Sequence, residues 1–178
     1  RRMANLMEEV LVLGRLDAAK MAYNPTPLDL PVLCRRITDE VLSATEGSCP
    51  IELILDSAPP QVNADEPLLR HILTNLLTNA VKYSDPGTPV DFDIGRQRCE
   101  AVFVVKDRGI GIPDDDKQWL FSAFHRGRNV GQRAGTGPGL VIVKRCVELH
   151  RGRIDIESKP CQGTRVTVRL PICPPSSN

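Results

Sequence analysis

The stretch that decides the fold is LLRHILTNLLTNAVKYS, which runs from Leu68 to Ser84. At about 100° per residue it predicts a helix with one broad apolar face that packs on a core. The apolar face consists of Leu69, Ile72, Leu73, Leu76, Leu77 and Ala80. A separate polar stripe, within an arc of roughly 80°, consists of His71, Asn75, Asn79 and Lys82. Asn is a mediocre helix former, so the presence of two Asn one turn apart needs an explanation. The ordinary explanation is that both side chains point to water.

Composition places the chain among globular proteins. Its 178 residues fit one domain with an appendage. The net charge of +1 gives no electrostatic reason to expect contact with nucleic acid or a membrane surface. No apolar run approaches the roughly 20 residues of a membrane span, no signal peptide opens the chain, and the six cysteines lack any C-x-x-C spacing. We therefore expect a cytoplasmic segment in a reducing compartment, which leaves open whether the full-length protein is anchored to a membrane.

Four segments are expected along the chain. Residues 1–23 have the apolar spacing of a coiled-coil seam and are expected to form one helix of a bundle, with folding back onto the domain as the alternative. Residues 24–30 are expected to be a linker, because two prolines stop any helix there. Residues 31–172 would form the main domain, and residues 173–178 a disordered tail. Because the first residue is Arg, we expect a piece of a longer protein.

Helical and strand patterns alternate in the main domain. Helices are expected over residues 28–45, 65–84 and 140–150, with a short one holding 119–124, and strands over 51–55, 90–94, 101–105, 153–157 and 165–170. The glycine-rich segment 125–139 has no apolar period, which predicts a loop. This order predicts a two-layer α+β domain, in which one mixed or mostly antiparallel sheet carries helices on one face.

A second chemical motif, Asp107-Arg-Gly-Ile-Gly, follows an apolar strand pattern. A carboxylate only accepts hydrogen bonds, as is required to hold an exocyclic amino group such as that of adenine. The two glycines allow the backbone to pass close to a flat ring. Alone, Asp-x-Gly is more often a plain turn.

A third motif, Gly135-Thr-Gly-Pro-Gly-Leu140, opens a helical pattern. Backbone N–H groups at a helix N-terminus bind anions, and glycines let a phosphate approach. The motif is weak evidence alone: it is not the dinucleotide fingerprint, and the chain has no Gly-Lys pair, which excludes a Walker A loop. The amide oxygens of the polar stripe suit Mg²⁺, and Lys82 is placed to reach a phosphate.

In this order, the motifs closely resemble those of the ATP-binding domain of sensor histidine kinases, in the GHKL or Bergerat-fold superfamily. Residues 75–84 resemble the N box of that family and residues 107–113 its G1 box. Residues 121–127 resemble its F box and residues 135–140 its G2 box. The resemblance covers roughly residues 27–172 and implies the Bergerat ATP-binding fold; the RLDAAKM sequence before it resembles the end of the second helix of the family's dimerisation bundle.

The resemblance implies ATP and Mg²⁺ as cofactors. Asn79 would bind Mg²⁺ with help from Asn75, and Lys82 would meet a phosphate. Tyr83 would pack near adenine, and Asp107 would bond its amino group. The further nucleotide-binding residues implied are Gly109, Gly111, Ile112, Gly135, Thr136, Gly137, Gly139, Leu140 and Thr164. The catalytic residues implied are Asn75, Lys82 and Arg126, with Arg128 as the alternative to Arg126 at the γ-phosphate.

The activity implied is transfer of the γ-phosphoryl group of Mg-ATP to a histidine on the dimerisation domain of the same protein. The implied partners are that domain and the receiver domain of a response regulator, with a homodimer as the full-length state. The three histidines of the chain, His71, His125 and His150, all lack the His-Asp/Glu-x-x-x-Pro context of the acceptor. This chain is therefore expected to bind nucleotide without phosphorylating itself.

Two departures from the family pattern leave alternatives open. Pro138 stands where the family usually has Leu, which removes one N–H and stiffens the loop; a degenerate kinase that serves as a nucleotide-binding scaffold is the first alternative. His71 stands where hydrolysing relatives have a catalytic Glu. That departure argues against the second alternative, an ATPase of the gyrase, mismatch-repair or chaperone type. The third alternative, an interaction module without nucleotide, requires all the motifs to be coincidence.

Overall fold

The computed structural model describes residues 23–122 and 139–172. The expected bundle helix up to residue 22, most of the glycine-rich segment and the expected tail lie outside the described residues. The elements, in chain order, are β1 (Thr26–Asp29), α2 (Leu30–Ala44), β2 (Ile51–Ile54), β3 (Gln61–Ala64), α3 (Glu66–Tyr83), β4 (Val90–Gln97), β5 (Glu100–Lys106), α4 (Asp114–Lys117), α5 (Gly139–Leu149), β6 (Arg153–Ser158) and β7 (Thr164–Pro171).

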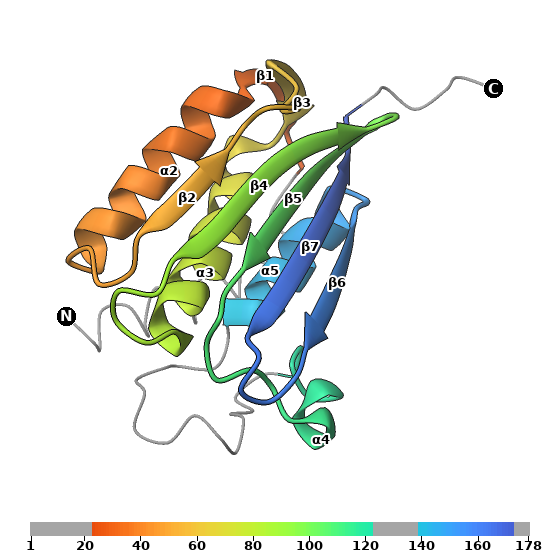
Figure 1. The fold of residues 1–178 in the computed structure, drawn as a ribbon. Coiled ribbons are helices and arrows are strands. Elements are labelled where there is room, and N and C mark those ends of the chain that lie inside the picture. Colours follow the sequence, from red (N-terminus) through yellow and green to blue (C-terminus); the bar gives the residue numbers. More distant parts are fainter. Residues whose placement is uncertain (1–22, 123–138, 173–178) are drawn as a thin grey trace.

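Five strands form the main sheet in the order β2-β4-β5-β7-β6. β2 pairs in parallel with β4, and the other neighbours pair antiparallel. Helices α2, α3 and α5 cover one face of this sheet (Figure 1). The prediction of a two-layer α+β domain with a mixed sheet is confirmed. Within the described residues, no helix is long and apolar enough to cross a membrane.

Helix α3 lies at the centre of the helical layer. Its six predicted core residues are all at most 4% exposed, and fully burying one such aliphatic side chain stabilises the fold by about 1.5–3 kcal/mol. The side chain of Asp65 caps the helix by accepting the N–H of Leu68 at 3.1 Å, and Pro67 occupies the first turn, where its missing N–H costs nothing. Because the apolar face of α3 is buried in the core, the orientation of the helix is set, and the polar stripe lies on the remaining surface of the helix.

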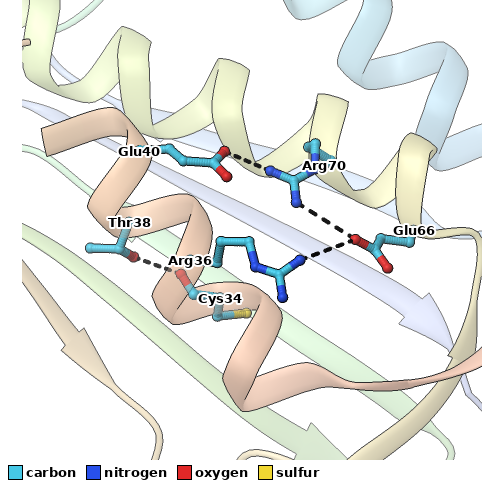
Figure 2. Close-up of polar contacts among 6 residues, drawn as sticks. All are labelled: Cys34, Arg36, Thr38, Glu40, Glu66 and Arg70. Atoms are coloured by element: carbon cyan, nitrogen blue, oxygen red, sulfur yellow. Dashed lines mark hydrogen bonds and ion pairs between the residues drawn. The ribbon is translucent and has the colours of Figure 1, made fainter. Parts of the chain in front are cut away.

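Ion pairs join α3 to α2 on the solvent side (Figure 2). Arg70 contacts Glu40 at 2.6 Å and Glu66 at 3.6 Å, and Arg36 contacts Glu66 at 3.9 Å. All four side chains are at least 31% exposed, and exposed ion pairs contribute little stability. We expect the apolar residues that α2 and α3 contribute to the common core, such as the fully buried Ile37, to stabilise their packing more.

The segment expected to be a linker contains a strand. Residues 26–29 form β1 and pair antiparallel with residues 61–64, which form β3, and no strand was expected over 61–64. Proline has no backbone N–H to donate to a neighbouring strand, so within sheets it is tolerated in edge strands. The prolines at 25 and 27 therefore agree with a position at the sheet edge. β3 has only two buried side chains, too few to give a strand period.

The short helix expected over residues 119–124 is misplaced. Helix α4 covers Asp114–Lys117 and ends before Trp119, which is 48% exposed. The aromatic residues of this stretch gave a helical pattern, but the helix itself is formed by the preceding acidic turn, where carboxylates at a helix N-terminus are favourable. The other predicted helices and strands are confirmed, with ends shifted by a few residues.

Candidate functional site

The polar stripe of α3 faces the first residue of α5. The side-chain Nδ2 of Asn75 donates to the carbonyl of His71 at 2.8 Å, so its Oδ1 is the atom left for other partners. A Cβ at Gly139 would lie 2.8 Å from this Oδ1 and 3.8 Å from Nδ2 of Asn79. Glycine therefore allows the start of α5 to approach the two asparagines without a shift of the Asn75 amide. The structure brings the N-box asparagines and the last glycine of the G2 box together.

Asp107 lies directly after β5 and is 8% exposed. Its Oδ1 accepts the backbone N–H of Gly109 at 2.9 Å and that of Thr164 at 3.1 Å. No hydrogen bond within the described residues reaches its Oδ2, and none of the unpartnered side-chain oxygens there is fully buried. Burial raises the pKa of Asp107, while the N–H groups of Gly109 and Thr164 act to lower it. The carboxylate is held through one oxygen and presents the other as an acceptor.

The G1 loop packs against the end of α3 by backbone contacts. The N–H of Ile110 donates to the carbonyl of Tyr83 at 3.2 Å, and a Cβ at Gly109 would overlap that carbonyl. Gly111 has a φ of +64°, and a Cβ there would overlap the carbonyl of Lys159. Both glycines are required by close backbone approach, which places Asp107 and Tyr83 at the same edge of the fold.

The last turn of α3 carries the predicted phosphate and adenine contacts. The Nζ of Lys82 lies 4.6 Å from the centroid of the Tyr83 ring, within the range of a cation–π interaction. Lys82 also lines a surface cleft of about 340 Å³ between α3 and the segment after α2. Within the described residues, the ammonium group of Lys82 thus contacts the aromatic ring of Tyr83.

The remaining predicted residues divide into three groups. Thr164 bonds to Asp107 through its N–H, and the N–H of Ile112 donates to the hydroxyl of Ser158 at 2.9 Å. Leu140 packs against the apolar core, as a partly buried residue of α5. The residues that lie outside the described part of the chain are Arg126, Arg128, Gly135, Thr136, Gly137 and Pro138.

Sequence reasoning missed Ser158, which joins the G1 loop to the turn between β6 and β7. A serine at the end of a strand has no pattern of its own, and its partner Ile112 is 46 positions away. The pairing of β5 with β7, which sets Lys106 opposite Arg165, and that of β7 with β6, which sets Thr164 opposite Ser158, bring the two segments together.

The amide groups of Asn75 and Asn79 fit the ligand chemistry of a magnesium ion. Within residues 23–122 and 139–172, no group of three His, Cys, Asp or Glu side chains could hold a metal ion. Asn75 and Asn79 offer amide groups where α5 begins, at Gly139. Mg²⁺ typically takes one or two protein ligands and completes its shell with phosphates and waters.

Comparisons with known proteins agree with this geometry. Residues 64–174 match the family described as histidine kinase-, DNA gyrase B-, and HSP90-like ATPase. The circadian input-output histidine kinase CikA of Synechococcus elongatus is 36% identical over 171 residues, which cover 93% of this chain and 23% of CikA. The sensor-like histidine kinase SenX3 of Mycobacterium tuberculosis is 34% identical over 173 residues, covering 96% of this chain and 42% of SenX3.

Two solved structures extend the likeness to the fold. The mycobacterial sensor histidine kinase MprB superposes with a TM-score of 0.71 at 28% identity, covering 83% of this chain and 97% of that one. Full-length ShkA in complex with AMPPNP gives a TM-score of 0.82 at 28% identity, covering 99% of this chain and 37% of that one. The chain belongs to the histidine kinase-, DNA gyrase B- and HSP90-like ATPase family. Within it, the chain is an ATP-binding domain of the sensor histidine kinase type, and it spans less than half the length of the two curated relatives named above.

Proposed function

We propose that this chain binds Mg-ATP and donates the γ-phosphoryl group to a histidine on a dimerisation domain, in two-component signal transduction. The observation that carries the proposal is the carboxylate of Asp107, which is buried and held through Oδ1, while no hydrogen bond from residues 23–122 or 139–172 reaches Oδ2. A fixed acceptor at the end of a buried strand suits the exocyclic amine of adenine. The AMPPNP complex of ShkA supports the same ligand class here.

The phosphate end of the nucleotide is assigned to the junction of α3 and α5. The N-terminus of α5 offers backbone N–H groups and a favourable dipole to an anion. Asn75 and Asn79 would hold Mg²⁺ at this junction, and Lys82 would meet a phosphate oxygen. When bound, Mg²⁺ would neutralise charge on the phosphates. Arg126, with Arg128 as the alternative, is proposed to act at the γ-phosphate.

The reaction needs an acceptor imidazole from outside this chain. A neutral imidazole nitrogen attacks the γ-phosphorus and forms a P–N bond, while the bond to the bridging β-phosphate oxygen breaks. ADP leaves with the electron pair, and the imidazole ring loses its single N–H proton, from the nitrogen that did not attack, to solvent or a base. The residues of this chain contribute mainly by positioning and by stabilising charge, as is usual for phosphoryl transfer.

The proposed partners follow from this reaction. They are the dimerisation domain of the same protein, which would make the full-length molecule a homodimer, and the receiver domain of a response regulator. The multidomain histidine kinases CikA and SenX3, of which this chain spans 23% and 42%, support such an arrangement. We assign no nucleic-acid or membrane contact to this segment, whose proposed location is the cytoplasm.

The test is phosphotransfer in trans. The 178-residue chain is incubated with γ-labelled ATP, Mg²⁺ and a separately purified dimerisation domain that carries its acceptor histidine. We expect an acid-labile label on that domain, which disappears with EDTA or when the acceptor His is changed to Gln. Tight nucleotide binding without transfer would favour the scaffold alternative. Steady hydrolysis without an acceptor would favour the ATPase alternative instead.

A further inference from the structure

Ser158 joins three backbone segments around the proposed adenine end of the site. It is the last residue of β6 and is 8% exposed. Its hydroxyl accepts the N–H of Ile112 at 2.9 Å and donates to the carbonyl of Gly163 at 2.9 Å. The same oxygen lies 2.9 Å from Oγ1 of Thr164. The hydroxyl therefore makes three hydrogen bonds, which uses its full capacity.

The three bonds fix where each hydroxyl proton points. A serine hydroxyl has one proton and two acceptor positions. The carbonyl of Gly163 has no proton to give, so it takes the only proton of Ser158. The N–H of Ile112 fills one acceptor position, which leaves the other for a proton from Thr164. The Thr164 hydroxyl proton is thereby committed to Ser158, and Oγ1 of Thr164 can only accept from any further partner.

Thr164 and Asp107 lie side by side. The N–H of Thr164 donates to Oδ1 of Asp107 at 3.1 Å, and the N–H of Asp107 donates to the carbonyl of Thr164 at 2.9 Å. The turn before Thr164 is pressed against the same loop, since a Cβ at Gly163 would overlap the carbonyl of Asp107. Asp107 and Thr164 are therefore neighbouring residues, each with an oxygen that can accept from a ligand: Oγ1 of Thr164, and Oδ2 of Asp107, which no hydrogen bond within the described residues reaches. The ionised carboxylate and the committed hydroxyl have no proton to offer a ligand.

We propose that Ser158 is a positioning residue that makes the site select a 6-aminopurine over a 6-oxopurine nucleotide. It acts through Thr164, by holding the threonine hydroxyl in the accepting orientation, either directly toward the base or toward one bridging water. An amino group has two protons for two acceptors. A 6-oxo group would leave its oxygen and both acceptors unpaired, and sites with unpaired buried polar groups discriminate strongly. This inference rests on the proposed binding of adenine at Asp107.

The decisive variant is Ser158→Ala in the full 178-residue chain. It releases the Thr164 proton, which can then turn toward the ligand and donate to a 6-oxo group. Calorimetric titration with ATP and with ITP measures the two affinities, and we expect their ratio to fall about five- to tenfold, the worth of one neutral hydrogen bond. The expected fall comes from weaker ATP binding together with stronger ITP binding.

The double variant Ser158→Ala/Thr164→Val distinguishes positioning of the Thr164 hydroxyl by Ser158 from a general loosening of the site. If the released proton of Thr164 is the cause, the gain in ITP affinity disappears when Val replaces Thr164. A site that is merely loosened would lose affinity for both nucleotides equally, and an unchanged ratio in Ser158→Ala would overturn the inference.

The single variant Thr164→Val keeps the inference falsifiable if Ser158→Ala does not fold. It removes the second acceptor while Ser158 stays in place, so ATP binding should weaken and ITP binding should not. A wild-type ratio in Thr164→Val would contradict the role of Thr164. Failure of the wild-type chain to bind ATP at all is a different result, since it overturns the proposed function and the inference with it.

Discussion

The backbone N–H of Thr164 donates to Oδ1 of Asp107 at 3.1 Å across 57 positions of the chain. The bond exists because β5 and β7 are neighbours in the sheet and their register sets Lys106 opposite Arg165. Asp107 is therefore held from two sides, by its own loop through Gly109 and by the adjacent strand. The carboxylate is positioned before any ligand arrives, which lowers the cost of ordering it on binding.

We predict that the charged carboxylate of Asp107 lowers the stability of the folded domain. Burial raises its pKa, so the folded state disfavours the charged form, and stability is lost as pH rises through the raised value. Asp107→Asn removes this charge, and its amide oxygen can still accept from Gly109 and Thr164. We expect its thermal midpoint at pH 7 to equal or exceed that of the wild type, with a flatter dependence on acid pH. A midpoint several degrees lower would contradict this account. The exposed residue Asp56 provides the matched control, Asp56→Asn.

Gly139→Ala should disrupt the phosphate end selectively. The new Cβ would lie 2.8 Å from Oδ1 of Asn75, so the Asn75 amide or the start of α5 must move. We expect at least a tenfold loss of ATP affinity and loss of its dependence on Mg²⁺, whereas adenosine, which has no phosphates, should bind as before. Titration of both ligands measures this difference. Equal losses for ATP and adenosine would show that the substitution acts on the whole fold instead.

His150 should make stability depend on pH. Its Nδ1 lies 2.8 Å from the carbonyl of Cys146, its Nε2 accepts the N–H of Asp65 at 3.3 Å, and its ring makes a T-shaped contact with the ring of Tyr23. Burial lowers the pKa of His150 from its ordinary 6.5, against opposing effects of the Cys146 carbonyl and the Asp65 carboxylate. Stability is therefore full above pH 6.5 and is lost as pH falls through the lowered value.

The variant His150→Gln tests this pH dependence because it cannot titrate. At pH 7.5 we expect it to be less stable than the wild type by about 1–3 kcal/mol, the cost of a disturbed buried hydrogen bond. The difference should shrink toward pH 5. Denaturant unfolding at both pH values measures it, and a difference that stays constant would exclude His150 as the titrating group.

The ion pairs and the apolar contacts between α2 and α3 should differ in how much they contribute to the free energy of unfolding. Arg70→Ala removes the ion pairs with Glu40 and Glu66 and should cost no more than about 1 kcal/mol, falling further in high salt. Ile37→Ala leaves a cavity beneath them and should cost about 2–5 kcal/mol. Urea unfolding gives both values. If Arg70→Ala were the more destabilising variant, the surface network would have to hold the helices together.

Local patterns predicted much of the fold. The period of α3 and the cap at Asp65 are contained in one continuous stretch, and the alternation of β4 and β5 shows which side chains face the core. β1 and β3 were missed because four-residue strands with prolines nearby are defined by each other rather than by their own pattern.

In the candidate site, too, some residues could be predicted from local sequence and others could not. Motifs located Asn75, Asp107 and Gly139, because their chemistry is carried by short sequences. The hydrogen bonds of Ser158 and the contact between His150 and Asp65 could not be predicted, since their partners are 46 and 85 positions apart. Which hydroxyl donates and which accepts around Ser158 can be assigned only when all three of its hydrogen bonds are considered together.

The most direct test of the central claim is calorimetric titration of AMPPNP into the wild-type chain and into Asp107→Asn, each with and without Mg²⁺. We expect binding to the wild type that Mg²⁺ strengthens, and at least a tenfold loss of affinity in an Asp107→Asn variant that remains folded. Equal affinity in the two proteins would contradict the assignment of Asp107 to the adenine amine. Absence of binding to the folded wild-type chain would contradict the nucleotide site itself.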